Sequence, residues 1–268
     1  MRLIDSITQY PGLENLKNMT NAWNKLIAEK SIPFDPEVLK EAIGKEVKTI
    51  CLPKNGKKVL KIEKKGECYT RLMSTKYPVG HYEIALAVFI QKLNDSCYAQ
   101  FTLTGNTENW DILNIYSDNS AEFIELKEWD SKDSPLFALV EALKNFELYN
   151  HISKLNKAQH TQFSDSSISI LAPIEYYIKY NLFSPFINKY TSNEFSDLIK
   201  ACKECFKVDI HLKALYLSKD DFNILSTKSD KAEDQNNLKK ADRERATVAN
   251  ITFSCPELLV ENWKTILS

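Results

Sequence analysis

Residues 110–129, WDILNIYSDNSAEFIELKEW, contain two apolar runs separated by a polar turn, with charged residues inside the runs. The runs have the length of strands, and the turn SDNS at 117–120 predicts a hairpin. Apolar side chains occur on both faces of each strand, which is typical of strands at the centre of a sheet. Asp111, Glu125 and Lys127 nevertheless fall inside these strands. Burying a carboxylate is costly unless it is paired or binds a metal, so these charges need an explanation.

The register of the hairpin determines whether the three charges meet. Opposite residues in a hairpin have a constant index sum, and side chains alternate between the two faces. A sum of 236 or 238 places Asp111 opposite Glu125 or Lys127, with all three on one face. A sum of 237 places Asp111 opposite Leu126 and separates the charges. The cluster therefore requires an odd-residue loop or a bulge at 117–120.

Two chemical interpretations of such a cluster are open. Neighbouring carboxylates repel unless a cation lies between them, and hard oxygen ligands suit Mg²⁺ or Mn²⁺. A lysine beside such ligands can orient a water against a phosphate and stabilise the developing charge. In the alternative, Asp111 pairs with Lys127 across the strands while Glu125 reaches solvent at a sheet edge. Such a pair contributes about 0.2 to 1 kcal/mol to stability.

The surrounding sequence predicts elements in the order α-β-β-β-α-β. The long helix after the hairpin is opened by Asp133 or Ser134, with Pro135 at its first position. The six predicted elements are a helix at 81–94, strands at 97–105, 110–117 and 121–129, a helix at 133–152 and a strand at 167–173.

This order, together with the charged residues, resembles the PD-(D/E)XK nuclease superfamily over residues 80–175. The family carries an acidic residue on the second core strand and a Glu-x-Lys or Asp-x-Lys on the third. Asp111 and the tripeptide 125–127 match that pattern, although Trp110 stands where the family name has proline. Two other Glu-x-Lys tripeptides, at 46–48 and 63–65, are not followed by a long helix.

The resemblance implies roles for individual residues. Asp111, Glu125 and the main-chain carbonyl of Leu126 would bind the metal, and Lys127 would place the attacking water. Glu83 on the preceding helix would bind the metal or orient the groups of the site. In some members the helix after the third strand adds a lysine, glutamine or tyrosine. The candidates for that position here are Glu141, Lys144 and Tyr149.

The implied fold is α/β (α+β), with a restriction-endonuclease-like αβββαβ core whose mixed central sheet is flanked by helices. The implied function is that of a metal-dependent phosphodiesterase, a nuclease with DNA as its main substrate and Mg²⁺ or Mn²⁺ as cofactor. Many relatives dimerise, so a homodimer is also expected. The alternative is a catalytically inactive nuclease-like fold that serves as a nucleic-acid-binding or protein-interaction module.

The remainder of the chain is expected to extend this core. The predicted divisions are 1–78 with helices and a small antiparallel meander, 79–226 with the core and added elements, a charged mobile loop at 227–247, and a strand and helix at 248–268 that pack on the core. The predicted elements outside the core motif are helices at 13–29, 36–44, 173–183, 193–206 and 256–267 and strands at 47–52, 58–63, 67–73, 208–218 and 248–253.

Positive charge is concentrated at 54–65, where six lysines accompany one glutamate. Phosphate contacts are therefore expected from Lys54, Lys57, Lys58 and Lys61. A solvated hairpin edge protected by lysines is the alternative. Only four of the 35 basic residues are arginines, so little direct reading of bases is expected.

Composition limits the setting in which the chain works. Its longest apolar run, 84–90, is too short to cross a bilayer, so no membrane association is expected. Six irregularly spaced cysteines among 268 residues indicate reduced thiols and a cytoplasmic location. The only C-x-x-C, Cys202 to Cys205, has no second ligand pair and is expected to pack in a core. The tyrosine-rich segment 175–180 also favours core packing over base stacking.

Overall fold

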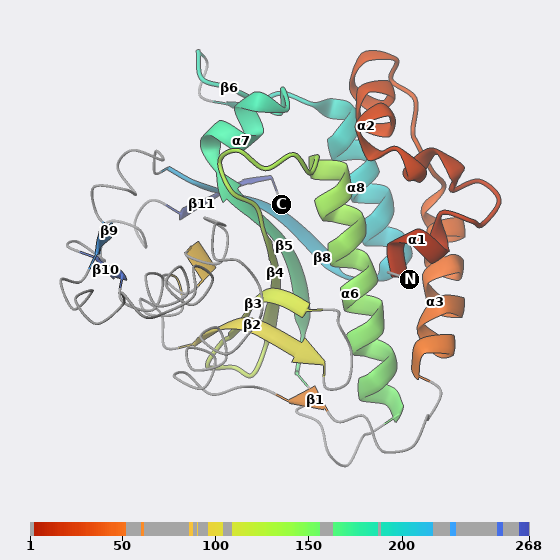
Figure 1. Ribbon diagram of the computed structural model, residues 1–268, viewed down its shortest axis with the longest axis horizontal. Coiled ribbons are helices and arrows are strands. Elements are labelled where there is room, and N and C mark those ends of the chain that lie inside the picture. Colours follow the sequence, from red (N-terminus) through yellow and green to blue (C-terminus); the bar gives the residue numbers. More distant parts are fainter. Residues whose placement is uncertain are drawn as a thin grey trace, which may run out of the picture.

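The computed structural model of this chain centres on a seven-stranded mixed sheet (Figure 1). In spatial order the strands are β1 (Leu60–Lys61), β2 (Cys97–Leu103), β3 (Asn109–Ile115), β4 (Ala121–Leu126), β5 (Ser166–Pro173), β8 (Asp209–Leu215) and β11 (Trp263–Leu267). The structure describes residues 3–51, 60–61, 86–87, 90, 96–103, 109–155, 163–186, 189–216, 226–228, 251–253 and 263–267.

The pairing of the strands changes from antiparallel to parallel at β4. The strands from β1 to β4 pair antiparallel, β5 and β8 continue parallel to β4, and β11 closes the sheet antiparallel to β8. Two short ribbons lie outside this sheet: β6 (Phe183–Ser184) with β7 (Lys189–Tyr190), and β9 (Ser226–Lys228) with β10 (Ile251–Phe253). The α/β class and the mixed sheet flanked by helices are therefore confirmed.

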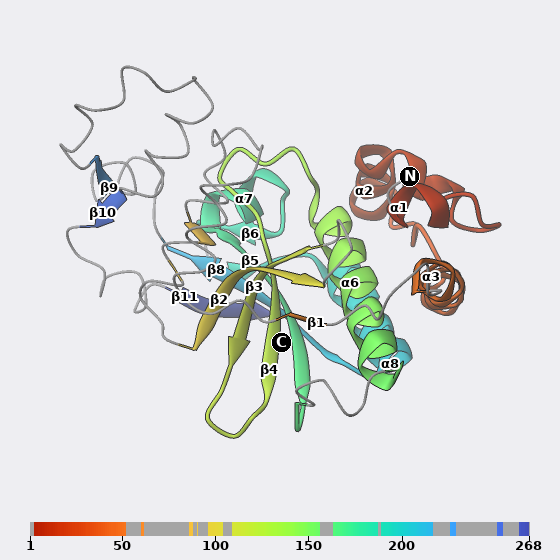
Figure 2. The ribbon, with the colours of Figure 1, turned by 60° about the horizontal axis from the view of Figure 1, so that its bottom comes forward.

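Two layers of helices cover one face of the sheet (Figures 1 and 2). The inner layer contains α6 (Pro135–Leu155), which packs on β4 and β5, and α8 (Asn193–Phe206), which packs on β8. The outer layer contains α1 (Leu3–Ile7), α2 (Met19–Ala28) and α3 (Pro36–Cys51). The short α7 (Ile174–Lys179) follows β5 directly and packs against it. Because α6 contacts helices on one side and strands on the other, most of its residues are buried.

A single buried core joins the sheet to the N-terminal helices. The ring of Phe123 on β4 packs against Phe146 and Tyr149 of α6, and Trp23 of α2 meets Phe195 of α8 edge to face. All six residues of β4 are buried, as expected for a strand paired on both edges. Charged side chains on β4 are therefore held in the interior of the molecule.

Side-chain caps start the helices where the sequence predicts them. The Ser134 hydroxyl accepts a hydrogen bond from the Phe137 amide at the start of α6, and Asp35 accepts one from the Glu37 amide at the start of α3. The long helix is therefore capped by Ser134, which leaves the side chain of Asp133 available for other contacts.

The N-terminal part differs from the sequence prediction in two ways. The helix predicted at 13–29 is divided into a 3₁₀ segment, Glu14–Lys17, and α2, which is capped by Asn18. The predicted stop at Gly44 and the strand at 47–52 are wrong, because α3 continues to Cys51. Ile43 and Val47 are fully buried on one face of α3, and this burial outweighs the roughly 1 kcal/mol that a glycine costs inside a helix.

The structure also differs from the sequence prediction in the predicted meander and at the end of the chain. The strand β1 lies within the predicted strand 58–63, but it pairs with β2 of the sheet and not with 47–52. The predicted final helix is wrong at Trp263–Leu267, where the chain forms β11 and pairs with β8. Pairing satisfies the open edge of β8, which a helix would leave exposed. The predicted strand 67–73, nearly all of the predicted helix 81–94 and nearly all of the predicted loop 227–247 lie outside the described residues.

Candidate functional site

The hairpin between β3 and β4 has the register that brings the charges together. Ile112 pairs with Ile124 and Leu113 with Phe123, which gives the index sum of 236. The closing pair is completed by the Tyr116 amide, which donates to the Ser120 carbonyl at 2.9 Å. The loop thus has an odd number of residues, as the cluster requires.

The residues of the turn explain this loop length. The Asn119 amide donates to the Tyr116 carbonyl, and Asn119 itself is left-handed, with φ of 64°. A turn followed by a left-handed residue is the usual three-residue hairpin connection, and asparagine tolerates this conformation well. Asp118 accepts hydrogen bonds from the amide and hydroxyl of Ser120, which fixes the turn further.

Asp111 lies where β3 and β4 stop pairing. The ladder between the two strands ends at Ile112 and Ile124, and the next β4 amide facing β3, that of Leu126, donates to Asp111 Oδ2 at 2.8 Å. The Asp111 carboxylate therefore occupies the position of a ladder acceptor. In a strand the N–H and C=O of one residue point to the same neighbour, so the Leu126 carbonyl is also directed toward β3.

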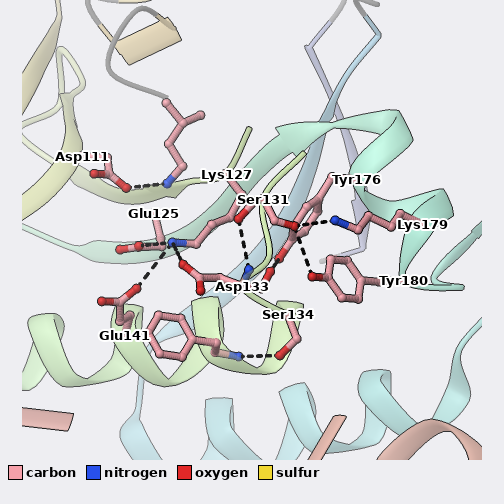
Figure 3. Close-up of polar contacts among 12 residues, drawn as sticks. Asp111, Glu125, Lys127, Ser131, Asp133, Ser134, Glu141, Tyr176, Lys179 and Tyr180 are labelled. Atoms are coloured by element: carbon pink, nitrogen blue, oxygen red, sulfur yellow. Dashed lines mark hydrogen bonds and ion pairs between the residues drawn. The ribbon is translucent and has the colours of Figure 1, made fainter. Parts of the chain in front are cut away.

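Lys127 lies at the centre of the charged cluster (Figure 3). Its Nζ is 2.9 Å from Glu125 Oε1, 3.4 Å from Glu141 Oε2 of α6 and 3.9 Å from Asp133 Oδ2. The Lys127 and Glu125 side chains are almost completely buried, that of Glu141 is a quarter exposed and that of Asp133 is half exposed. The cluster therefore extends from the sheet interior to the surface.

The electrostatics of the cluster favour a cation. Burial raises the pKa of Glu125 well above its usual value, Lys127 opposes that rise, and Asp111 and Glu141 add to it. Three carboxylates, those of Glu125, Glu141 and Asp133, surround the Lys127 ammonium group, and the charge of Asp111 acts on Glu125 as well. An additional positive charge beside Glu125 would lower the cost of keeping its carboxylate ionised.

The alternative is wrong about the position of Glu125. It requires Glu125 to reach solvent at a sheet edge, but Glu125 is 5% exposed and β4 is an internal strand. The partner of Glu125 is Lys127, and Asp111 accepts from the Leu126 amide.

The loop that follows Lys127 is held by α7 (Figure 3). The Ser131 carbonyl accepts hydrogen bonds from Lys179 Nζ at 2.7 Å and from the Tyr180 hydroxyl at 3.2 Å. The Tyr176 hydroxyl donates to the Asp133 carbonyl at 2.9 Å. These contacts fix the backbone that carries the Asp133 side chain toward Lys127.

The three helix residues that the sequence left open have different surroundings in the structure. Glu141 contacts the cluster through Lys127, whose Nζ donates to Glu141 Oε2 at 3.4 Å. Lys144 is buried at 2% exposure, and the Tyr149 ring lies in the aromatic core 4.7 Å from Phe123. Asp133 was expected only as a helix cap, and its position before a Ser-Pro helix start gave no signal of its proximity to Lys127.

Several predicted site residues are not described by the structure. Glu83 and the lysines Lys54, Lys57 and Lys58 lie outside the described residues, and Lys61 is described only as part of the backbone of β1. Their predicted roles remain predictions.

The donor set of the cluster suits a small hard cation. Within the part of the chain that is described, no group of three or more His, Cys, Asp or Glu side chains is arranged to hold a metal ion. Mg²⁺ does not require one, because it retains several waters and binds through one or two carboxylates. Asp111, Glu125 and the Leu126 carbonyl would supply such a partial set.

A second buried polar cluster lies on the opposite face of β4. Glu122, only 1% exposed, accepts hydrogen bonds from the hydroxyls of Ser169 and Tyr116 and forms an ion pair with Lys213. These partners outweigh the effect of burial, and the pKa of Glu122 is lowered. Glu122 is thus a fully paired buried carboxylate, three residues before Glu125 on β4 and on the opposite face of the sheet.

The other motifs with open interpretations pack in the core. Cys202 and Cys205 are buried free thiols on α8, and burial raises the pKa of both. Tyr176 and Tyr177 are fully buried, and the Tyr177 hydroxyl donates to the Ile170 carbonyl of β5. Base stacking by these two tyrosines is excluded by their burial.

Comparisons with known proteins give no identification. A scan against protein-family models, a search of curated proteins and a search of solved structures each find no match to this chain. Among the described helices, none has the length and apolar character needed to cross a membrane. The function of the chain is therefore inferred from the geometry of its site.

Proposed function

We propose that this chain is a metal-dependent phosphodiesterase of the PD-(D/E)XK type, a nuclease with DNA as its main substrate. The observation that carries the proposal is the hairpin register with index sum 236, which brings Asp111, Glu125 and Lys127 together in a buried cluster rich in carboxylates. The strand order from β2 to β5, with α6 between β4 and β5, supports the same restriction-endonuclease-like core.

Each residue of the cluster has a role in this proposal. Asp111, Glu125 and the Leu126 carbonyl hold Mg²⁺ or Mn²⁺. Glu83, from the preceding segment, binds the metal or orients the groups of the site. When bound, the ion polarises a phosphate oxygen and lowers the pKa of a coordinated water. Lys127 orients the attacking water and stabilises the negative charge that develops on the phosphate.

The nucleic-acid partner is proposed from charge. Lys54, Lys57, Lys58 and Lys61 lie in the most basic segment of the sequence, and lysines bind phosphates as point charges without reading bases. A homodimer would present one active site to each strand of a duplex, which is the reason for proposing one.

A cleavage assay tests the proposal. Purified protein is incubated with plasmid, single-stranded DNA and RNA in Mg²⁺, Mn²⁺ or EDTA, alongside Glu125→Ala and Lys127→Ala. We expect cutting that requires the metal and is abolished by both substitutions. Glu122→Gln is the matched control, because it alters another buried carboxylate of β4 on the opposite face. Circular dichroism of every variant establishes that it is folded.

A catalytically inactive fold is the second candidate function. Its supporting observation is the 2.9 Å contact between Lys127 and Glu125, which already neutralises the most buried carboxylate of the cluster. Under this alternative the protein binds nucleic acid or another protein, and the ion pair is structural. Binding to DNA that survives Glu125→Ala and Lys127→Ala, without cutting under any metal condition, would support it.

A further inference from the structure

Lys127 is shared unequally between two elements. Its ammonium is 2.9 Å from Glu125 of its own strand and 3.4 Å from Glu141 of α6. Charge-assisted N–H···O bonds are usually about 2.7 to 2.9 Å long. The contact with Glu125 has this length, and the contact with Glu141 is longer and therefore weaker. Glu125 is thus the nearer partner of Lys127 when no cation is considered.

The proposed metal site creates a conflict at Glu125. The same carboxylate would bind a divalent cation and also keep the ammonium of Lys127 in contact. Two positive groups on one buried carboxylate repel strongly, because there is little water to screen them. Lys127 therefore needs another negative partner within reach when the cation binds.

We propose that Glu141 is the residue that receives the Lys127 ammonium when a divalent cation binds Glu125, and so acts as a positioning residue of the site. This inference rests on the proposed function. The Glu141 contact then shortens while the Glu125 contact lengthens, and Lys127 is held beside the site without competing for its ligand.

The surroundings of Glu141 suit this role. Its neighbours Val140 and Ala142 on α6 are fully buried, so the backbone that carries Glu141 is fixed in the core. Its side chain is a quarter exposed, and it retains access to solvent while reaching Lys127. Asp133, at 3.9 Å and half exposed, adds a weaker attraction from the same side.

Calorimetric titration with Mn²⁺ tests the inference with two variants and a control. Glu141→Gln removes the charge, whereas Glu141→Asp keeps the charge and shortens the side chain by one methylene. Glu147→Gln is the matched control, because Glu147 is a partly buried glutamate of the same helix whose charged neighbours are Lys40 and Lys154. Circular dichroism verifies the fold of each variant.

Glu141→Gln is expected to weaken Mn²⁺ binding by about 10- to 100-fold, as is usual when a partner that orients a metal site is lost. Glu141→Asp keeps the negative charge and is expected to weaken Mn²⁺ binding less. The control should bind like the wild type. Wild-type-like binding by Glu141→Gln would overturn the inference, and so would binding by Glu141→Asp that is weaker than binding by Glu141→Gln. If the wild type itself binds no Mn²⁺, the proposed function fails and this inference fails with it.

A crystal structure with Mn²⁺ gives a second reading that does not depend on the variants. The inference expects Lys127 Nζ closer to Glu141 than to Glu125 once the ion is bound. A bound ion with Lys127 still at Glu125 would overturn the inference while leaving the proposed function standing.

Discussion

The Leu126 amide donates a hydrogen bond to the Asp111 carboxylate at 2.8 Å, at the point where the ladder between β3 and β4 ends. One carboxylate oxygen thus replaces a backbone acceptor in the sheet, and the carboxylate stays close to Glu125. Asp111 therefore has a structural task that can be separated from its proposed task as a metal ligand.

Two substitutions at Asp111 separate these tasks. Asp111→Ala leaves the buried Leu126 amide without its acceptor, and we expect a loss of about 1 to 3 kcal/mol in the free energy of unfolding. Asp111→Asn keeps an acceptor oxygen in place and should cost less than Ala. Both should abolish metal-dependent cutting, because neither supplies a carboxylate. Urea unfolding and the plasmid assay measure the two effects, and full activity in either variant would exclude Asp111 as a ligand.

The turn gives a prediction about stability. Asn119 has a positive φ of 64°, which a residue with a branched Cβ adopts only at a cost. We expect Asn119→Val to lower the free energy of unfolding by about 1 to 2 kcal/mol and Asn119→Gly to leave it nearly unchanged. Urea unfolding of both variants checks this. Equal stability of the two would show that the left-handed residue does not fix the loop.

The raised pKa of Glu125 predicts opposite pH dependences for metal binding and for stability. A cation needs the ionised carboxylate, so Mn²⁺ affinity should increase as the pH rises through the raised pKa. Without metal, the folded protein holds this proton more tightly than the unfolded chain. The contribution of Glu125 to stability is then fully present below its usual value of 4.5 and is lost as the pH rises through the folded-state value.

Glu125→Gln provides the comparison for both pH series, because it removes the titrating group while keeping the shape. In this variant, the pH dependence of Mn²⁺ affinity and the pH dependence of the free energy of unfolding should each lack the part assigned to Glu125. Calorimetry with Mn²⁺ and urea unfolding over the same pH range measure the two quantities. A wild-type pH profile of Mn²⁺ binding in the variant would assign the titration to another group.

His211 on β8 predicts a second pH effect, with the reverse sign. Burial and the nearby Lys213 lower the pKa of His211. The unfolded chain therefore binds a proton more readily, and stability should fall as the pH drops through 6.5 toward the folded-state pKa. Urea unfolding at several pH values should show this loss, and His211→Gln should reduce it. An unchanged profile in the variant would contradict the assignment.

The sequence allowed prediction of the parts of the site that depend on local pattern. Alternation in the two strands and the turn residues led to the index sum of 236 as one of two acceptable registers, and the structure has it. The boundaries of α8 were predicted correctly, because Ser192 caps the helix and its apolar residues recur at helical spacing. Local chemistry and tertiary packing favour the same structure at these places.

Where local pattern and tertiary packing conflicted, the prediction failed. Gly44 is a stop signal by local rules, but burial of Val47 continues the helix past it. Trp263–Leu267 is the end of the segment predicted as a helix at 256–267, yet it forms a strand because β8 offers an unpaired edge. Glu141 was one of three candidates from the sequence, and its contact with Lys127 depends on the rotation of α6 against β4, which no short sequence window contains.

The most direct test of the metal site is a crystal structure of the wild-type protein grown with Mn²⁺, with data collected at the manganese absorption edge. The account predicts an anomalous peak between the Asp111 and Glu125 carboxylates, within coordination distance of the Leu126 carbonyl. A structure with no manganese at this position, and with the Leu126 amide still bonded to Asp111 and Lys127 still bonded to Glu125, would contradict it.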